Sequence, residues 1–162
     1  LAQCALRVWA VEPQRCVLDV LKRTLAANAP YGGIELFPFA LGACEGETFA
    51  PDIRLDDSKN FGGVSMGKPH SEHPDAPMYR VPVVALDTMK FPNMPVTFIK
   101  VDIEGGEMAF LHGAVETIRK YKPIMFIECD HPDTDTQELG RTIEAIGYNV
   151  EVHNNNFLGM PV

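Results

Sequence analysis

Two short and almost wholly apolar segments, residues 96–103 and 123–129, are each followed by a segment in which apolar residues recur at helical spacing. Segments this apolar are typical of strands that are buried on both faces of a sheet. Their alternation with helices predicts an α/β domain with a mostly parallel sheet and helices on both of its faces. Ligands bind such sheets at the carboxyl ends of the strands, so polar residues at those ends are the first candidates for a site.

The rest of the chain continues this alternation. A strand at residues 7–11 ends at Glu12-Pro13, and Pro13 suits the first turn of a helix that would end near residues 28–30. Pro38 within a strand at 34–41 demands an edge position or a bend. The remaining expectations are extended segments at 47–53 and 79–86, a loop at 62–77, one helix with Met108, Leu111, Val115 and Ile118 on one face, a helix at 135–147 and a strand at 148–153.

Length and charge narrow the possible partners. The chain has 162 residues, the size of one domain, and a net charge of −8, which argues against nucleic-acid and anionic-membrane partners. No apolar run approaches the roughly 20 residues that span a bilayer, and no signal peptide is visible. The four cysteines form no C-x-x-C pair and are expected to be reduced thiols. We therefore expect a cytoplasmic protein without nucleic-acid partners and without a membrane partner for this segment.

Acidic side chains follow three of the expected strands. Glu12 ends one strand, Asp102 and Glu104 follow another, and Glu128 and Asp130 follow a third. Because parallel strands share one rim, these carboxylates are expected to converge on one crevice. The alternative is that each acid only caps the first turn of the next helix.

Glu12 also fits a more specific role. A carboxylate at a strand end can accept hydrogen bonds from the vicinal hydroxyls of a ribose, as in nucleoside-cofactor sites. Such a site normally includes a glycine-rich turn, and neither G-x-G-x-x-G nor a P-loop signature occurs in the chain. Either there is no such cofactor, or the strand and turn that precede Leu1 are absent.

The motifs that follow resemble one family. Residues 98–107 (FIKVDIEGGE) and 111–114 (LHGA) are similar to the "IKxDxEGxE…LxGA" motif of the FkbM-type methyltransferases. The order and spacing of further motifs agree over residues 7–150. These motifs are VWAVEP at 8–13, FALG at 39–42, ALDT at 85–88 and PIMFIE at 123–128.

The resemblance implies a class I methyltransferase fold, which is Rossmann-like, with S-adenosylmethionine as cofactor. It also implies O-methylation of a small-molecule or glycan hydroxyl. Family members carry a "DxGANxG" loop on the first strand, and nothing before Leu1 supplies it here. We therefore expect residues 1–162 to form a single, incomplete methyltransferase domain that lacks the first strand and the main cofactor loop.

The resemblance also implies roles for individual residues. Glu12 would hold the ribose, residues 40–42 would lie near the adenine, and Asn60 would belong to a loop that closes over the cofactor. Asp102 would lie where the methionine part of the cofactor meets the acceptor. The expected cofactor contacts are therefore Glu12, Ala40, Leu41, Gly42, Asn60 and Asp102.

Asp102 and Glu104 are the expected catalytic residues. A hydroxyl acceptor must lose its proton, so a general base is needed, and either carboxylate could serve or could position the substrate. Two nearby carboxylates can raise one another's pKa toward a useful range. They could instead hold a divalent metal, but the pair is too common to indicate one, and we expect no metal. His131 is a second candidate base, whereas His70 and His73 are expected in a solvated loop.

Two other classes of function stay open. The chain could be a non-catalytic or degenerate binding module that keeps the methyltransferase fold. It could also be a nucleotide-dependent oxidoreductase, although the missing glycine fingerprint counts against that class as well. The segment Asp102-Ile103-Glu104-Gly105 favours methyl transfer.

Overall fold

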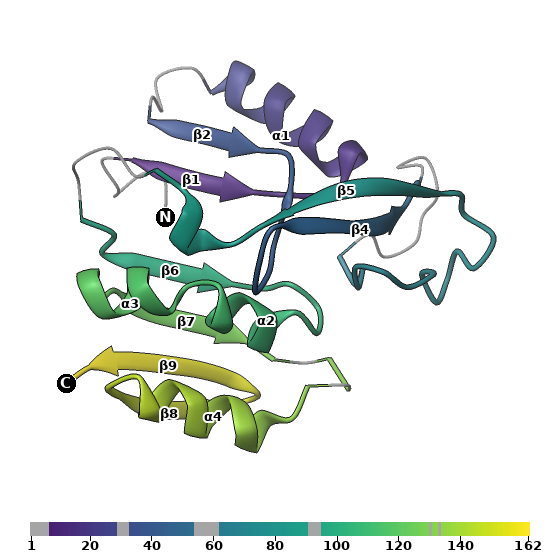
Figure 1. Ribbon diagram of the computed structural model, residues 1–162. Coiled ribbons are helices and arrows are strands. Elements are labelled where there is room, and N and C mark those ends of the chain that lie inside the picture. Colours follow the sequence, from purple (N-terminus) through teal and green to yellow (C-terminus); the bar gives the residue numbers. More distant parts are fainter. Residues whose placement is uncertain (1–6, 29–32, 54–61, 91–94, 130, 133) are drawn as a thin grey trace. The chain divides into compact units, whose positions relative to one another are not determined.

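The computed structural model describes residues 7–28, 33–53, 62–90, 95–129, 131–132 and 134–162 (Figure 1). The chain divides into two compact units. The first comprises Leu1–Ala40 and Gly46–Val83, and the second comprises Leu41–Glu45 and Val84–Val162. The first unit holds a two-stranded sheet and most of a three-stranded sheet, the second holds a four-stranded sheet, and each unit has its own hydrophobic core.

The first unit begins with a strand–helix–strand segment, as expected. Strand β1 (Val8–Val11) and strand β2 (Ile34–Phe37) pair in parallel, and helix α1 (Arg15–Ala27) connects them. Pro13 lies just before the helix, where its missing N–H costs nothing. The helix buries Leu18 and leaves most of its polar residues exposed.

The strand expected at residues 34–41 is interrupted at Pro38. Strand β2 ends at Phe37, and a second short strand, β3, covers only Ala40–Leu41. Pro38 has no N–H to donate to a ladder, which explains the break. Strands β4 (Gly46–Pro51) and β5 (Met78–Val84) pair antiparallel, and the sheet order is β3-β5-β4. The core of this unit consists of Ala40, Ala50 and Val81, with Met66, Tyr79 and Val83 packed against it.

The loop between β4 and β5 differs from its prediction at one residue. His70 is only 5% exposed, so its placement in a solvated loop was wrong. Its ring lies 5.3 Å from that of His73, and its Nδ1 accepts a hydrogen bond from the N–H of Glu72. Residues 70–73 therefore turn back on themselves, and the imidazole of His70 is buried.

The second unit contains a mixed four-stranded sheet of order β6-β7-β9-β8 (Figure 1). Strands β6 (Phe98–Val101) and β7 (Ile124–Glu128) are parallel, as expected. Strand β8 (Tyr148–His153) was also expected, but strand β9 (Asn156–Pro161) was not. Because β9 runs antiparallel to both β7 and β8, a mostly parallel Rossmann-like sheet is not confirmed.

Three helices, α2 (Glu107–His112), α3 (Val115–Tyr121) and α4 (Thr136–Ala145), pack on one face of this sheet (Figure 1). On the opposite face, Phe98 and Ile124 remain at least 36% exposed. The fully or nearly fully buried residues of the helix-covered face include Val101, Phe110, Leu111, Ile118, Met125, Ile127, Leu139, Ile143 and Phe157.

The single helix expected after residue 106 is in fact two helices. Gly113 separates them, and a Cβ at Gly113 would overlap the carbonyl of Gly42. Asp87, in the short 3-10 helix η1 (Leu86–Thr88), caps the second helix by accepting hydrogen bonds from the N–H groups of Glu116 and Thr117, at 3.0 and 2.7 Å. Within the described residues, no helix combines the length and apolarity needed to cross a bilayer.

Candidate functional site

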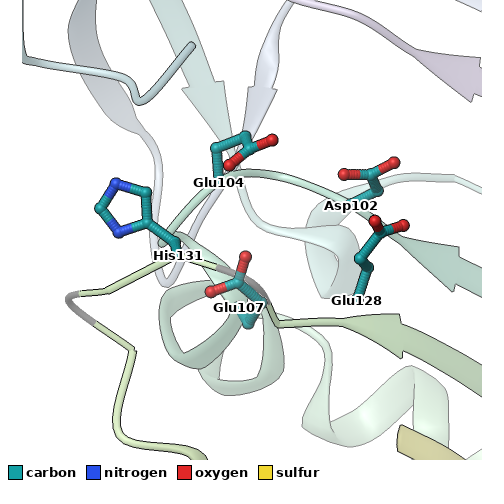
Figure 2. Close-up of a pocket in the computed structure, with 5 residues that line it drawn as sticks. All are labelled: Asp102, Glu104, Glu107, Glu128 and His131. Atoms are coloured by element: carbon teal, nitrogen blue, oxygen red, sulfur yellow. The ribbon is translucent and has the colours of Figure 1, made fainter. Parts of the chain in front are cut away.

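A small acidic pocket lies at the carboxyl ends of β6 and β7, within the second unit (Figure 2). Its volume of about 60 Å³ has room for one or two waters or for a single functional group of a ligand. The predicted pair Asp102 and Glu104 lies here together with Glu128 and His131, so this part of the expected rim does converge. The lining residues are Asp102, Glu104, Glu107, Glu128 and His131.

A turn with an unusual backbone carries Glu104 into the pocket. Glu104 has φ +50° and Gly105 has φ +95°, so two consecutive residues are left-handed. For a residue with a side chain this conformation costs on the order of 1 kcal/mol. Gly105 must also be small, because a Cβ there would lie 2.9 Å from Nδ1 of His131. The glycine therefore lets the imidazole pack directly on the turn.

Glu107 joins the two loops of the pocket. It is the first residue of α2 and is only 1% exposed. Its Oε1 accepts a hydrogen bond from the N–H of Gly105 at 3.0 Å, and its Oε2 accepts one from the Thr134 hydroxyl at 2.8 Å. A buried carboxylate is costly unless it is hydrogen-bonded, and both of its oxygens are. Glu107 was not predicted as a site residue, because its role depends on a partner 27 positions away in the sequence.

Lys100 provides positive charge beside the pocket. Its Nζ lies 2.7 Å from Oδ2 of Asp102 and 3.5 Å from Oε2 of Glu128. All three side chains are more than a third exposed, so solvent weakens these ion pairs. The ammonium still orients the two carboxylates and offsets part of their mutual repulsion.

The pocket changes the proton affinity of Glu104. Burial raises its pKa above the ordinary range, and the negative charge of Asp102 raises it further. His131 acts in the opposite direction, while Glu107 and Glu128 add smaller upward effects. A carboxylate with a raised pKa is a stronger base than an ordinary one, which suits proton abstraction.

Glu12 lies in the first unit, directly after β1 as expected. Its backbone N–H donates to the carbonyl of Phe37 at 3.0 Å, which continues the β1–β2 ladder. Its Oε1 accepts a hydrogen bond from the N–H of Gln14 at 2.7 Å. Burial raises the pKa of Glu12, and the Gln14 hydrogen bond partly offsets this effect. A carboxylate has about four acceptor positions, so this one can also accept from two hydroxyl groups.

The remaining predicted site residues have different surroundings. Ala40 belongs to the core of the first unit, whereas Leu41 packs against the core of the second. Gly42 is buried, and its N–H donates to the carbonyl of Val84 at 3.0 Å. Asn60 and Asp130 lie outside the described residues. Among the residues that the structure does describe, no three His, Cys, Asp or Glu side chains are arranged to hold a metal ion.

The fold matches that of a methyltransferase. The crystal structure of methyltransferase FkbM from Methylobacillus flagellatus KT is similar to this chain, with a TM-score of 0.64 and 24% sequence identity. The match covers 94% of this chain and 36% of the other, so this chain spans about a third of that protein's length. At this identity the likeness shows the fold.

The sequence itself shows the family. The profile of the methyltransferase FkbM domain matches residues 3–150. The chain therefore belongs to the FkbM methyltransferase family, which confirms the resemblance of its motifs. A comparison with curated proteins gave no match.

Proposed function

We propose that this chain is part of an enzyme that transfers a methyl group from S-adenosylmethionine to a hydroxyl of a small molecule or sugar. The observation that carries the proposal is the family match over residues 3–150. The match extends over both units, so we assign them to a single methyltransferase domain. The acidic pocket at the ends of β6 and β7 supports the proposal, because ligands bind at this end of such strands.

The residues of the chain are chemically suited to the cofactor. Glu12 is a half-buried strand-end carboxylate with one oxygen already oriented by a backbone N–H, which suits it to the ribose hydroxyls. Residues 40–42 and Asn60 are assigned to the adenine side of the cofactor site. Asp102 is assigned to the methionine part. The 60 Å³ pocket is far too small for the whole cofactor, so we assign it to the reacting groups.

Glu104 is assigned as the general base. When bound, S-adenosylmethionine supplies a methyl group whose bond to the sulfonium sulfur breaks as a new bond to the acceptor oxygen forms. The acceptor hydroxyl loses its proton, and Glu104 receives it. We favour Glu104 over Asp102 because Asp102 is paired with Lys100 at 2.7 Å, whereas the pocket raises the pKa of Glu104.

The other pocket residues have supporting roles in this proposal. Asp102, oriented by Lys100, is assigned to the methionine part of the cofactor, where its negative charge would attract the sulfonium in the bound state. Glu107 holds the turn that carries Glu104, and His131 packs on Gly105 in the same turn. Positioning of donor and acceptor supplies a large part of the rate in such a displacement.

Isothermal titration of the intact protein with S-adenosylmethionine tests the cofactor assignment. Wild-type protein is expected to bind, and Glu12→Gln is expected to weaken binding by about tenfold or more, as expected for loss of charged hydrogen bonds. Glu35→Gln is the matched control, because Glu35 is a half-exposed glutamate on the neighbouring strand, paired with Arg7. A folded wild-type protein that does not bind would contradict the proposal.

A further inference from the structure

Tyr79 on β5 holds the turn that carries Glu12, although the two residues are far apart in sequence. Its hydroxyl donates a hydrogen bond to the carbonyl of Pro13 at 3.1 Å and accepts one from the N–H of Arg15 at 3.0 Å. The guanidinium carbon of Arg15 lies 4.1 Å from the centre of the Tyr79 ring. One side chain therefore fixes the backbone on both sides of Gln14.

The start of α1 needs such a partner. The first N–H groups of a helix have no acceptor within the helix, and the N-cap residue Gln14 makes no side-chain capping bond. The Tyr79 hydroxyl supplies an acceptor for Arg15 from another strand. Burial raises the pKa of Tyr79, so its hydroxyl keeps its proton at neutral pH and can donate and accept together.

We propose that Tyr79 is a positioning residue for the cofactor. It fixes Gln14, the N–H of Gln14 orients the carboxylate of Glu12, and Glu12 receives the ribose hydroxyls. The inference rests on the proposed function, because it gives a purpose to the orientation of Glu12. Tyr79 acts only through Glu12, so its loss should weaken cofactor binding without slowing the methyl-transfer step.

The experiment is a double-mutant cycle on the intact protein, with Kd for S-adenosylmethionine measured by isothermal titration. Tyr79→Phe removes both hydrogen bonds but keeps the ring under Arg15. It is expected to raise Kd by about three- to tenfold, the usual effect of losing one or two neutral hydrogen bonds, with kcat unchanged at saturating cofactor. Because Tyr79 acts through Glu12, Tyr79→Phe should add less than twofold to the defect of Glu12→Gln.

A second tyrosine provides the matched control. The Tyr148 hydroxyl also donates to a proline carbonyl, that of Pro123, at 2.9 Å, but in the core of the second unit. Tyr148→Phe should lower the melting temperature and leave the cofactor Kd unchanged. A 2′-deoxyribose analogue of the cofactor gives an independent reading. The ratio of its Kd to that of the cofactor measures the preference for the 2′-hydroxyl, and partial unfolding does not change this ratio. The ratio should shrink in Tyr79→Phe.

The outcomes separate the two proposals. If the wild type does not bind S-adenosylmethionine, the proposed function fails and the role of Tyr79 fails with it. If the wild type binds and Glu12→Gln weakens binding, an unchanged Kd in Tyr79→Phe overturns only the role of Tyr79. Full additivity of the two substitutions, or an unchanged preference for the 2′-hydroxyl, overturns it as well.

Discussion

Replacement of Glu107 by alanine is expected to destabilise the protein and to disorganise the pocket. The substitution leaves the N–H of Gly105 and the hydroxyl of Thr134 without their acceptor. Hydrogen bonds to charged groups contribute about 1.5–3 kcal/mol each, so the two together set an upper limit of about 6 kcal/mol. Gly105 is exposed and Thr134 is partly exposed, so both donors can recover water. We therefore expect a loss of about 2–4 kcal/mol.

Two conservative variants identify the source of this loss. Glu107→Gln keeps one acceptor oxygen, and its amide can donate to the Thr134 hydroxyl, so it should cost only about 1 kcal/mol. Thr134→Ala removes one of the two bonds and should cost about 1–2 kcal/mol. Because both residues share a bond, the cost of Glu107→Ala and Thr134→Ala together should be less than the sum of the single costs.

Urea unfolding at neutral pH measures these free energies, with an unchanged m-value as the check on the extrapolation. The folded Glu107→Ala protein should also lose turnover, because the hydrogen bonds that link the Glu104 turn to the loop after β7 are then lost. A Glu107→Ala protein within about 0.5 kcal/mol of the wild type, the range of ordinary surface substitutions, would refute the reasoning.

Substitutions at three positions in or beside the same pocket give the further predictions. Glu104→Gln should lower kcat by about 10²- to 10⁴-fold. In the wild type, activity should fall as the pH drops through the raised pKa of Glu104. If the same fall at low pH persists in the Glu104→Gln variant, Glu104 is not the general base. Because its pKa is raised in the folded protein, Glu104 destabilises the protein when it is ionised. The Glu104→Gln variant should therefore unfold at a higher urea concentration than the wild type at pH 7, and this difference should disappear below a pH of about 4. Gly105→Ala should destabilise the protein more than Gly147→Ala. Both glycines have φ +95°, but of the two only Gly105 faces His131, so adding His131→Ala should remove the difference. Equal losses of stability from the two glycine substitutions would exclude the contact. Lys100→Met should change stability by less than about 1 kcal/mol. It should also move the fall in activity at low pH to a higher pH. If that fall does not move, the Lys100 ammonium does not act on Glu104.

Short-range signals were sufficient for much of the fold. Glu12-Pro13 marks the end of β1 and the start of α1, and both lie where the sequence places them. The apolar runs around residues 98–101 and 124–128 are parallel strands, as expected. In each case the signal lies within a few residues of the element that it predicts.

Strand β9 could not be predicted in the same way. Its sequence, NFLGMP, contains a glycine and a proline and shows no clean alternation. It becomes a strand because β7 and β8 pair with it on both sides. Gly159 also lets the strand lie close to the Tyr148 ring, which a Cβ would approach to 3.2 Å. The mixed character of the sheet therefore comes from tertiary pairing.

The candidate site shows the same limit. Asp102 and Glu104 follow a recognisable strand, so sequence reasoning could place them at one rim. Glu107 looks like an ordinary acidic residue in the first turn of a helix, a position that is usually exposed. Its burial and its contacts with Gly105 and with Thr134, which belongs to another loop, show that it joins the two parts of the pocket.

Transfer of an isotope-labelled methyl group from S-adenosylmethionine to hydroxyl-bearing acceptors tests the central claim most directly. The intact protein should produce a label that survives mild base, because a methyl ether is stable there and a methyl ester is not. Glu104→Gln should bind the cofactor as the wild type does and produce almost no label. A folded, cofactor-binding wild type that labels only nitrogen, sulfur or carboxylate groups, or a fully active Glu104→Gln protein, would contradict the account.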